Sequence, residues 1–141
     1  MKKVLSIITI AFLLTSCGIS EKVELSLADQ IAGDYSVNTF TLRGQKIPLP
    51  INLGGEYLAI DMQIHKQNEE LVNVKLITKS TTNGNTSESV DDIQNVVLSK
   101  NETGFIDLMS ENQRLGFYSE GSVTFEIEQN GEKSSFSASK K

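Results

Sequence analysis

Hydrophobic and polar residues alternate with a period of two along most of the chain from residue 33 onwards. The clearest run extends from Leu58 to Ile64, where every second residue is apolar. Such alternation is typical of a β-strand with one face buried and the other in water. About eight segments are predicted to be strands of this kind: residues 34–43, 57–67, 70–80, 93–100, 104–110, 114–119, 122–129 and 132–138.

Tight turn signals separate these segments at close spacing. Asn83-Gly84 and Asn130-Gly131 supply the positive φ angles that a two-residue hairpin turn requires. Short strands joined by hairpins predict an antiparallel up-and-down sheet, and about eight strands hide their edges best when the sheet closes on itself. The pattern therefore predicts an all-β fold, an antiparallel barrel of about eight strands.

A short helical turn is expected before the first strand. Ser26 can cap residues 26–31, Asp29 three positions later gives a pattern similar to a capping box, and Gly33 ends the turn. Within the first strand the phase of the alternation changes near Phe40 and Leu42, which indicates a bulge or a change of register.

The connection between the first two predicted strands, residues 44–56, is unusually long. Its two prolines disfavour strand pairing, and Gly54-Gly55 provides a flexible return. The segment nevertheless carries four apolar residues in alternation, Ile47, Leu49, Ile51 and Leu53. Two interpretations follow: a flap that plugs one end of the barrel, or a lid over a ligand-binding opening at that end.

A different pattern occupies the N-terminus. The first three residues include two lysines, and residues 4–14 are almost entirely apolar. This run is shorter than the roughly 20 residues that cross a bilayer as a helix, and it has the regions of a secretory signal. Leu14-Thr15-Ser16-Cys17 then resembles the lipobox of bacterial lipoproteins, with the only cysteine of the chain in the required place.

Resemblance to lipoproteins implies cleavage before Cys17, a diacylglyceryl thioether on its sulfur and a further fatty acid, such as palmitate, on its new amino group. Residues 1–16 would be the signal peptide, 17–27 a lipidated tether and 28–141 the barrel domain, held to a membrane of the cell envelope by its acyl chains. Gly18 stands where an aspartate retains enterobacterial lipoproteins in the inner membrane, which favours the outer membrane if the cell has one. The alternative is an ordinary signal peptide with an incidental cysteine.

Composition narrows the classes of function. One cysteine and one histidine exclude an internal disulfide framework and a cysteine- or histidine-rich metal site. Without residues 1–16, 11 basic residues stand against 18 acidic ones, a net charge of −7. This charge argues against nucleic acid as a partner and against close docking on anionic lipid.

The start of the predicted domain resembles a known family. A helical turn, then Gly33-Asp34-Tyr35 opening the first strand, then a long loop and seven further strands are similar to lipocalins and related small calycin domains. Their signature there is Gly-x-Trp, so Tyr35 stands in place of the tryptophan, and the arginine that packs on it has no match. The resemblance implies that Gly33 permits a close backbone approach and that the Tyr35 ring closes the bottom of the barrel.

Signals of catalysis are weak. His65 falls on the polar face of its strand without a nucleophile motif, so an exposed strand residue is expected rather than a base or a metal ligand. Glu88, Asp91 and Asp92 follow a Ser/Thr/Asn-rich stretch, and their spacing differs from that of a calcium loop, so a solvated loop is expected there. We predict a protein that is not an enzyme and needs no cofactor or metal.

Binding is the predicted function. A barrel of this size can hold one small apolar ligand in its opening, beneath residues 44–56. The inward residues expected there, each of which is more readily explained as plain core, are Leu58, Ile60, Met62, Val72, Val74, Phe117, Phe125 and Ile127. The alternative is a solid barrel that docks an envelope protein through an exposed apolar patch at residues 47–53 and at Tyr57 and Ala59. A small hydrolase has no supporting motif, and only the long loop permits a hydrolase inhibitor.

Overall fold

The computed structural model describes residues 23–129 and 131–141; the predicted signal peptide, Cys17 and the first part of the tether lie outside the described residues. One short helix and ten strands follow one another along the chain. They are α1 (Leu27–Ile31), β1 (Gly33–Leu42), β2 (Gln45–Pro48), β3 (Ile51–Leu53), β4 (Glu56–Lys66), β5 (Leu71–Thr82), β6 (Asn85–Lys100), β7 (Ile106–Ser110), β8 (Gln113–Ser119), β9 (Ser122–Gln129) and β10 (Glu132–Lys140).

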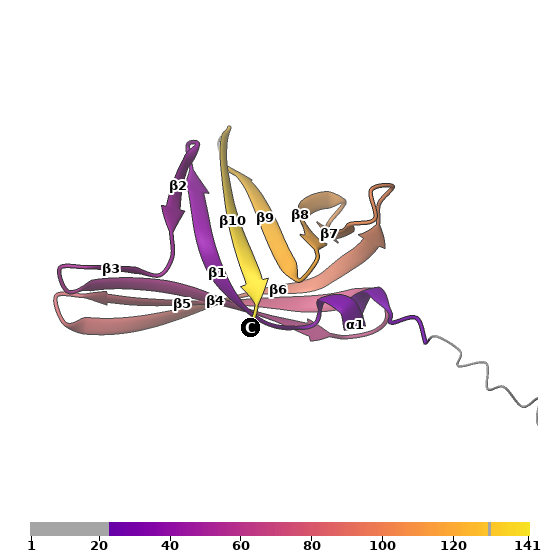
Figure 1. The fold of residues 1–141 in the computed structure, drawn as a ribbon, viewed down its shortest axis with the longest axis horizontal. Helices are drawn as coiled ribbons and strands as arrows, with labels where there is room; N and C mark the ends of the chain where they lie inside the picture. The colour runs from indigo at the N-terminus through magenta and orange to yellow at the C-terminus, as the bar shows by residue number, and fades with distance from the viewer. Residues whose placement is uncertain (1–22, 130) are drawn as a thin grey trace, which may run out of the picture.

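Eight of the strands close into an antiparallel barrel. From β4 to β10 each strand pairs with the next along the chain, and β10 pairs with β1. Residues 33–36 of β1 then pair with residues 61–64 of β4, which closes the ring. The predicted up-and-down barrel is therefore confirmed, and so is the helical turn before its first strand (Figure 1).

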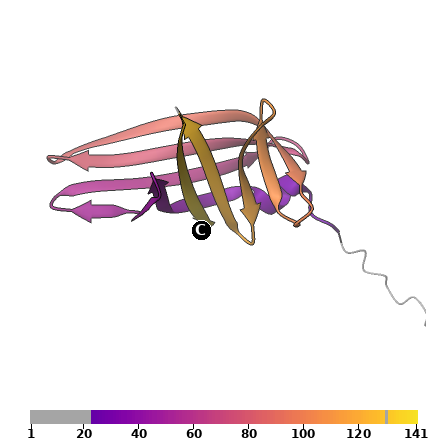
Figure 2. The same ribbon diagram turned by 90° about the horizontal axis from the view of Figure 1, so that it is seen from above.

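The barrel is closed at one end only. Beyond residue 36, β1 separates from β4 and pairs with β2, while the far part of β4 pairs with β3. The sheet thus continues as two arms: a long arm of β3 and the outer parts of β4, β5 and β6, and a short arm of β2 and the outer parts of β1, β9 and β10. In Figure 1 the long arm runs to the left and the short arm upwards. Figure 2 shows the β9–β10 hairpin crossing the long strands steeply.

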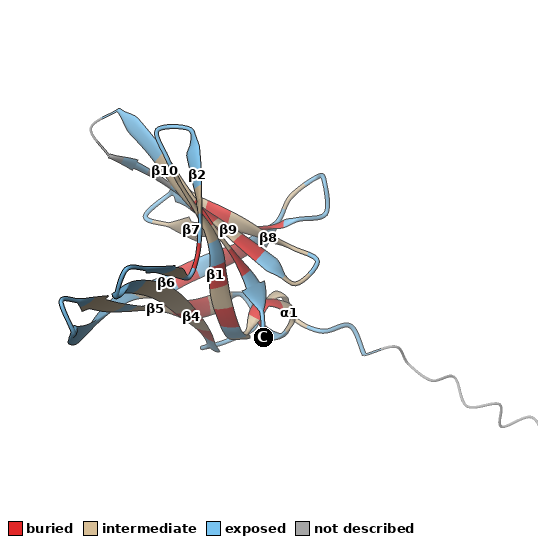
Figure 3. Cartoon of the chain, turned by 60° about the vertical axis from the view of Figure 1, so that its left-hand side comes forward, coloured by how far each residue is buried: buried red, intermediate tan, exposed pale blue. Residues whose placement is uncertain are grey.

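The core lies in the closed half, where the arms meet. Its buried side chains belong to one apolar cluster, and the largest of those that are fully enclosed include Tyr35, Ile31, Met62 and Leu108. Figure 3 shows this concentration of buried residues, with the arms mainly half-buried or exposed. Within residues 23–129 and 131–141, none of the buried side chains is charged or polar apart from the Tyr35 phenol. The closed half therefore presents an apolar surface toward the open end of the barrel.

Helix α1 covers the closed end. Ser26 is its N-cap and accepts a hydrogen bond from the Asp29 backbone N–H at 3.2 Å, as the capping pattern predicts. The Lys66 amine at the end of β4 lies 2.7 Å from the Asp29 carboxylate. Ala28 and Ile31 are fully buried, so the helix seals this end with one apolar face.

Tyr35 lies beneath the helix, where the first strand begins. Its side chain is 0% exposed, and its hydroxyl donates to the Ile31 backbone carbonyl. Gly33 has a φ of +145°, and an added Cβ there would lie 2.7 Å from the Lys140 side chain. The Lys140 amine lies 6.0 Å from the centre of the Tyr35 ring, so a cation does cover this ring, but it comes from the last strand.

Two predicted loops contain strands instead. Residues 44–56 include β2 and β3, because each has a free strand edge beside it once β1 and β4 separate. The polar stretch from Ser80 to Asp92 continues β5 and β6, paired across the Asn83-Gly84 turn (φ of 51° and 77°). Cross-strand hydrogen bonds hold both segments although neither buries a full apolar face.

The predicted change of register in β1 is confirmed. The pairing of β1 with β10 shifts between Val37 and Thr39. The bulged residue Asn38 turns its carbonyl away from β10 and accepts a hydrogen bond from the Leu49 backbone N–H at 2.9 Å. Leu49 is buried, so the bulge anchors the connection between β2 and β3 to the barrel.

No helix within residues 23–129 and 131–141 combines the length and the apolar character needed to cross a bilayer.

Candidate functional site

The open end of the barrel exposes apolar side chains on its inner face. Phe40, Ile51, Leu58, Ile60 and Leu76 are partly buried and pack against the edge of the core. The registers carry this face further out along both arms, because Ile51 lies opposite Leu58 on the long arm and Phe40 opposite Ile47 on the short arm. The result is an apolar surface that the protein itself covers only in part.

Two leucines of this surface are exposed to water. Leu42 at the tip of β1 is 40% exposed, and Leu53 at the tip of β3 is 73% exposed. Both lie on the inner face of their arms, since Leu42 follows Phe40 by two residues and Leu53 follows Ile51 by two. Transfer of one such side chain out of water stabilises a complex by about 1.5–3 kcal/mol at full burial. The open end can therefore bind an apolar group.

Seven of the eight predicted pocket residues separate into three groups. Met62, Val72, Val74 and Phe125 are buried in the closed half, at 0–2% exposure, and are core. Leu58 and Ile60 lie at the open end, where a ligand could reach them. Ile127 pairs with Ser134 in the backbone register, and its side chain lies outside the described part of the chain.

Phe117 points outward, contrary to the prediction. Its neighbour Gly116 is buried opposite Phe125, so Phe117 falls on the other face of the sheet, opposite Thr124. There it stacks on Phe105, with ring centres 5.6 Å apart. The cause is a register shift between Leu108 and Met109 against β8, which the alternation in this short strand does not reveal.

The apolar patch expected of a docking module is divided between two faces. Leu53 lies on the inner face, whereas Tyr57 pairs with Asn52 and lies on the outer face, where it is 38% exposed. Ala59 shares the outer face with Tyr57. Residues 47–53 and Tyr57 therefore do not form one contiguous surface.

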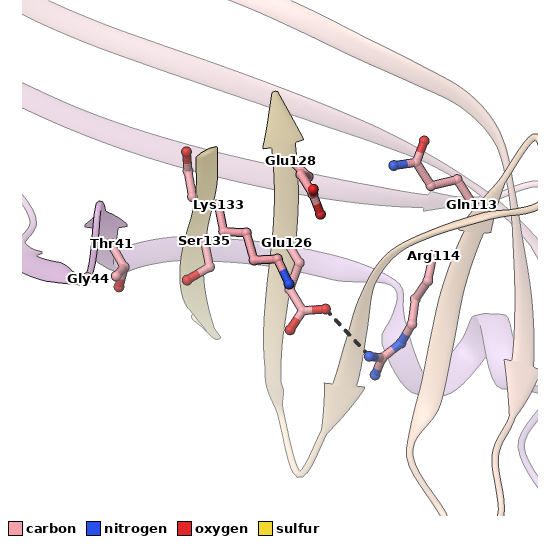
Figure 4. Close-up of a pocket in the computed structure, with 9 residues that line it drawn as sticks. Thr41, Gly44, Gln113, Arg114, Glu126, Glu128, Lys133 and Ser135 are labelled. Atoms are coloured by element: carbon pink, nitrogen blue, oxygen red, sulfur yellow. Dashed lines mark hydrogen bonds and ion pairs between the residues drawn. The ribbon is translucent and has the colours of Figure 1, made fainter. Parts of the chain in front are cut away.

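A polar groove of about 410 Å³ lies on the outside of the barrel, across β8, β9, β10 and β1 (Figure 4). Its walls carry both charges and hydroxyl groups. The lining residues are Thr41, Gly44, Gln113, Arg114, Glu126, Glu128, Lys133, Ser134 and Ser135. Sequence reasoning missed this groove, because its residues look like the ordinary polar face of a half-buried sheet.

Arg114 is the most constrained side chain of the groove. Its guanidinium lies 3.0 Å from the Asp107 carboxylate and 3.5 Å from that of Glu126. The same group lies over the Phe117 ring, 5.1 Å from its centre. Figure 4 shows the Lys133 and Arg114 side chains extending toward Glu126 from opposite sides.

Two groups at the closed end have shifted pKa values. Burial raises the pKa of the Tyr35 phenol, and the nearby Tyr118 adds to this shift. Hydrogen bonds from Lys66 and Ser26 lower the pKa of the Asp29 carboxyl. Both groups hold α1 against the barrel, so the shifts reflect structure at the closed end and lie away from the open end and the groove.

The candidate catalytic groups are dispersed. His65 is exposed on β4, as expected. Glu88, Asp91 and Asp92 are exposed on β6, where Asp91 and Asp92 point to opposite faces of the strand. Among the described residues, no group of three His, Cys, Asp or Glu side chains is placed to hold a metal ion.

Comparison with known proteins gives no assignment: no family model, curated protein or solved structure matches this chain.

Proposed function

We propose that this protein is a lipoprotein of the cell envelope whose lipocalin-like barrel binds a small apolar ligand at its open end, without catalysis. The observation that carries the proposal is the separation of β1 from β4, which leaves apolar inner side chains partly uncovered beside an apolar core. The ligand class follows from that surface, because an apolar wall without buried charge favours hydrocarbon over polar groups.

The proposed lipid anchor at Cys17 is supported by the sequence alone. Leu14-Thr15-Ser16-Cys17 resembles a lipobox, and acyl chains on Cys17 would hold the domain at a membrane, the outer one where two exist. Mass spectrometry of the mature N-terminus tests this part. A diacylglyceryl group on Cys17 is expected, and an unmodified cysteine would contradict it.

Ligand binding is tested on the Cys17→Ala chain, which we expect to be water-soluble and free of detergent. Solvent extraction and mass spectrometry should detect a co-purified lipid or other apolar molecule. A fluorescent fatty acid should bind and be displaced by unlabelled fatty acid. Leu58→Gln should weaken this binding about tenfold, because it places an amide on the apolar wall.

Ala59→Gln is the matched control for Leu58→Gln. Residue 59 is adjacent in the chain but lies on the outer face of the same strand. Its substitution should leave the affinity for the fatty acid unchanged. A chain that carries no extractable ligand and binds no fatty acid would contradict the binding proposal, as would equal effects of the two variants.

The second candidate is an envelope protein-interaction module. It is favoured by the edges of β2 and β3, each of which pairs on one side only with a strand of the described part of the chain. Such edges can accept an extended segment of a partner. Pull-down from solubilised membranes separates the candidates: a protein partner without co-purified lipid supports the module, and the reverse supports the ligand binder.

A further inference from the structure

We propose that the outer groove is a second binding site, and that it takes a neutral, polyhydroxylated ligand: an oligosaccharide lying across β8, β9, β10 and β1. This site is independent of the open end. Its walls alternate hydrogen-bond donors with acceptors, whereas the open end is apolar. Three features of the groove support this ligand: the register of its strands, its balance of charge and the fixed position of Arg114.

The register places the lining side chains in two rows that cross the strands. In the first row, Ser135 on β10 lies opposite Thr41 on β1 and opposite Glu126 on β9. In the second row, Lys133 lies opposite Glu128. Neighbouring strands are about 4.8 Å apart, which is close to the repeat of a pyranose chain. Successive sugar rings can therefore meet successive strands.

The chemistry of the walls matches hydroxyl groups. Arg114 and Lys133 can only donate hydrogen bonds, and the carboxylates of Glu126 and Glu128 can only accept them. A sugar hydroxyl does both, so it can bridge a cation and a carboxylate on adjacent strands. The two positive and two negative groups cancel, which disfavours a phosphate or another strongly charged ligand.

Arg114 supplies a donor that is ordered before a ligand arrives. Asp107 and Glu126 form ion pairs with its guanidinium, which also lies over the Phe117 ring. Phe117 is itself stacked on Phe105. A donor held in this way loses little conformational freedom on binding, which favours affinity for a ligand that offers only hydroxyl groups.

Lys133 and Glu128 provide the test, because they are exposed and their substitution should not disturb folding. Over residues 23–129 and 131–141, no ion pair joins either of them to another side chain. Glu128→Gln keeps the size of the side chain and removes the charge. Lys133→Gln removes the opposite charge and shortens the side chain.

The experiment is calorimetric titration of the full chain carrying Cys17→Ala with three neutral probes: maltohexaose, cellohexaose and the hexamer of N-acetylglucosamine. At least one probe should bind, and both glutamine variants should weaken that binding about tenfold. Glu102→Gln and Lys100→Gln, exposed charges outside the groove, should leave it unchanged. The Leu58→Gln variant should also bind the sugar normally, which separates this site from the ligand site at the open end.

Several results would overturn the assignment. One is the absence of heat of binding with all three probes. Another is binding that the Glu102 and Lys100 controls weaken as much as the Glu128 and Lys133 variants do. A third is tighter binding of an acidic polymer such as polyglutamate than of any neutral sugar, because it would show that the groove selects charge.

Discussion

Gly116 shows how a single residue limits the shape of the barrel. It lies in β8, where an added Cβ would be 2.0 Å from the Thr124 carbonyl oxygen and 2.9 Å from the Phe125 Cα. Both atoms belong to the backbone of β9, so neither can move without disturbing the sheet. The glycine is required for space and lets the two strands approach closely.

Gly116→Ala should therefore destabilise the fold. Forcing one methyl group into a packed site costs about 1–3 kcal/mol, and here the clash is with backbone. Chemical denaturation should show a lower free energy of unfolding for this variant. Ser122→Ala, an exposed position on the adjacent strand, is the control and should match the parent protein. Equal stability of Gly116→Ala and the parent would mean that the close approach is not required.

The buried phenol of Tyr35 makes the free energy of unfolding depend on pH in the alkaline range. Burial raises the pKa of its phenol in the folded state above the value near 10 of an unfolded chain. The stabilisation from the neutral phenol is complete below about pH 10 and is lost as the pH rises, by about 1.4 kcal/mol per pH unit at most. Denaturation from pH 8 to 11.5 should show this loss in the parent protein.

Tyr35→Phe should remove that dependence. The variant loses the hydrogen bond to the Ile31 carbonyl, which costs about 1 kcal/mol at neutral pH. Above pH 10 the difference in stability between parent and variant should shrink, since only the parent must keep a phenol protonated. Tyr57→Phe, on the exposed outer face, controls for general effects of alkali. A constant difference across this range would contradict the prediction.

Among the elements, α1 is held against the barrel by an ion pair and a backbone hydrogen bond. Lys66 reaches from the end of β4 to Asp29, lowering the pKa of that carboxyl, and the backbone N–H of Ala28 donates to the Glu69 carbonyl at 3.0 Å. Because the pKa of Asp29 is lowered in the folded state, the stabilisation from its ion pair with Lys66 is complete above about pH 4. It is lost as the pH falls below that value.

Lys66→Met should raise the pKa of Asp29 toward the ordinary aspartate value. An NMR titration of the Asp29 side-chain carboxyl carbon measures this directly. Amide hydrogen exchange in α1 should also become faster in this variant, while exchange in β9 and β10 stays the same. Lys100→Met, an exposed lysine on β6, serves as the control. An unchanged Asp29 titration would show that Lys66 does not bind it in solution.

At the element scale, much of the fold could be predicted from the sequence. The eight barrel strands, the capped turn at Ser26 and the bulge before Phe40 all follow from alternation and turn chemistry. Two segments predicted as loops are strands: residues 80–92, whose polarity does not alternate, and the short strands β2 and β3, where Pro48 and Pro50 indicated a loop despite the alternation. Their pairing depends on an adjacent edge, which is a property of the assembled sheet.

The candidate site was less predictable than the fold. Alternation identified Leu58 and Ile60 correctly as inward residues, but it could not show that Met62 lies in sealed core while Leu58 lies at an opening. That difference depends on where β1 leaves β4. The groove was missed for a related reason, since Arg114, Glu126 and Lys133 become neighbours only through the register of three strands.

On the scale of the whole molecule, the two ends of the barrel are unlike. The chain enters at the closed end through α1, and the C-terminus lies there too, because the Lys141 backbone N–H donates to the Asp34 carbonyl at 2.9 Å. Figure 1 places the tip of β3 far from α1. If Cys17 is lipidated, its tether therefore leaves from the closed end, and the open end points away from the membrane.

Site-specific labelling tests this orientation. Cys17 would be blocked by lipid, so a new cysteine at Phe105 or Leu53 takes a fluorescent label alone. Phe105 lines a hollow with Gln30 of α1, and Leu53 lies at the tip of the long arm. In vesicles with a headgroup quencher, the label at residue 105 should be quenched more strongly than the label at residue 53. Reversed quenching would contradict the orientation.

Among the described residues, the outer edges of β2 and β3 are unpaired, which has a consequence for the width of the opening. Each strand pairs with one neighbour, so the arms can move apart without breaking a hydrogen bond of the eight-stranded ring. The opening can thus change width while the global free energy of unfolding stays the same. If a ligand binds at the open end as proposed, its entry and release would not require unfolding of the closed half.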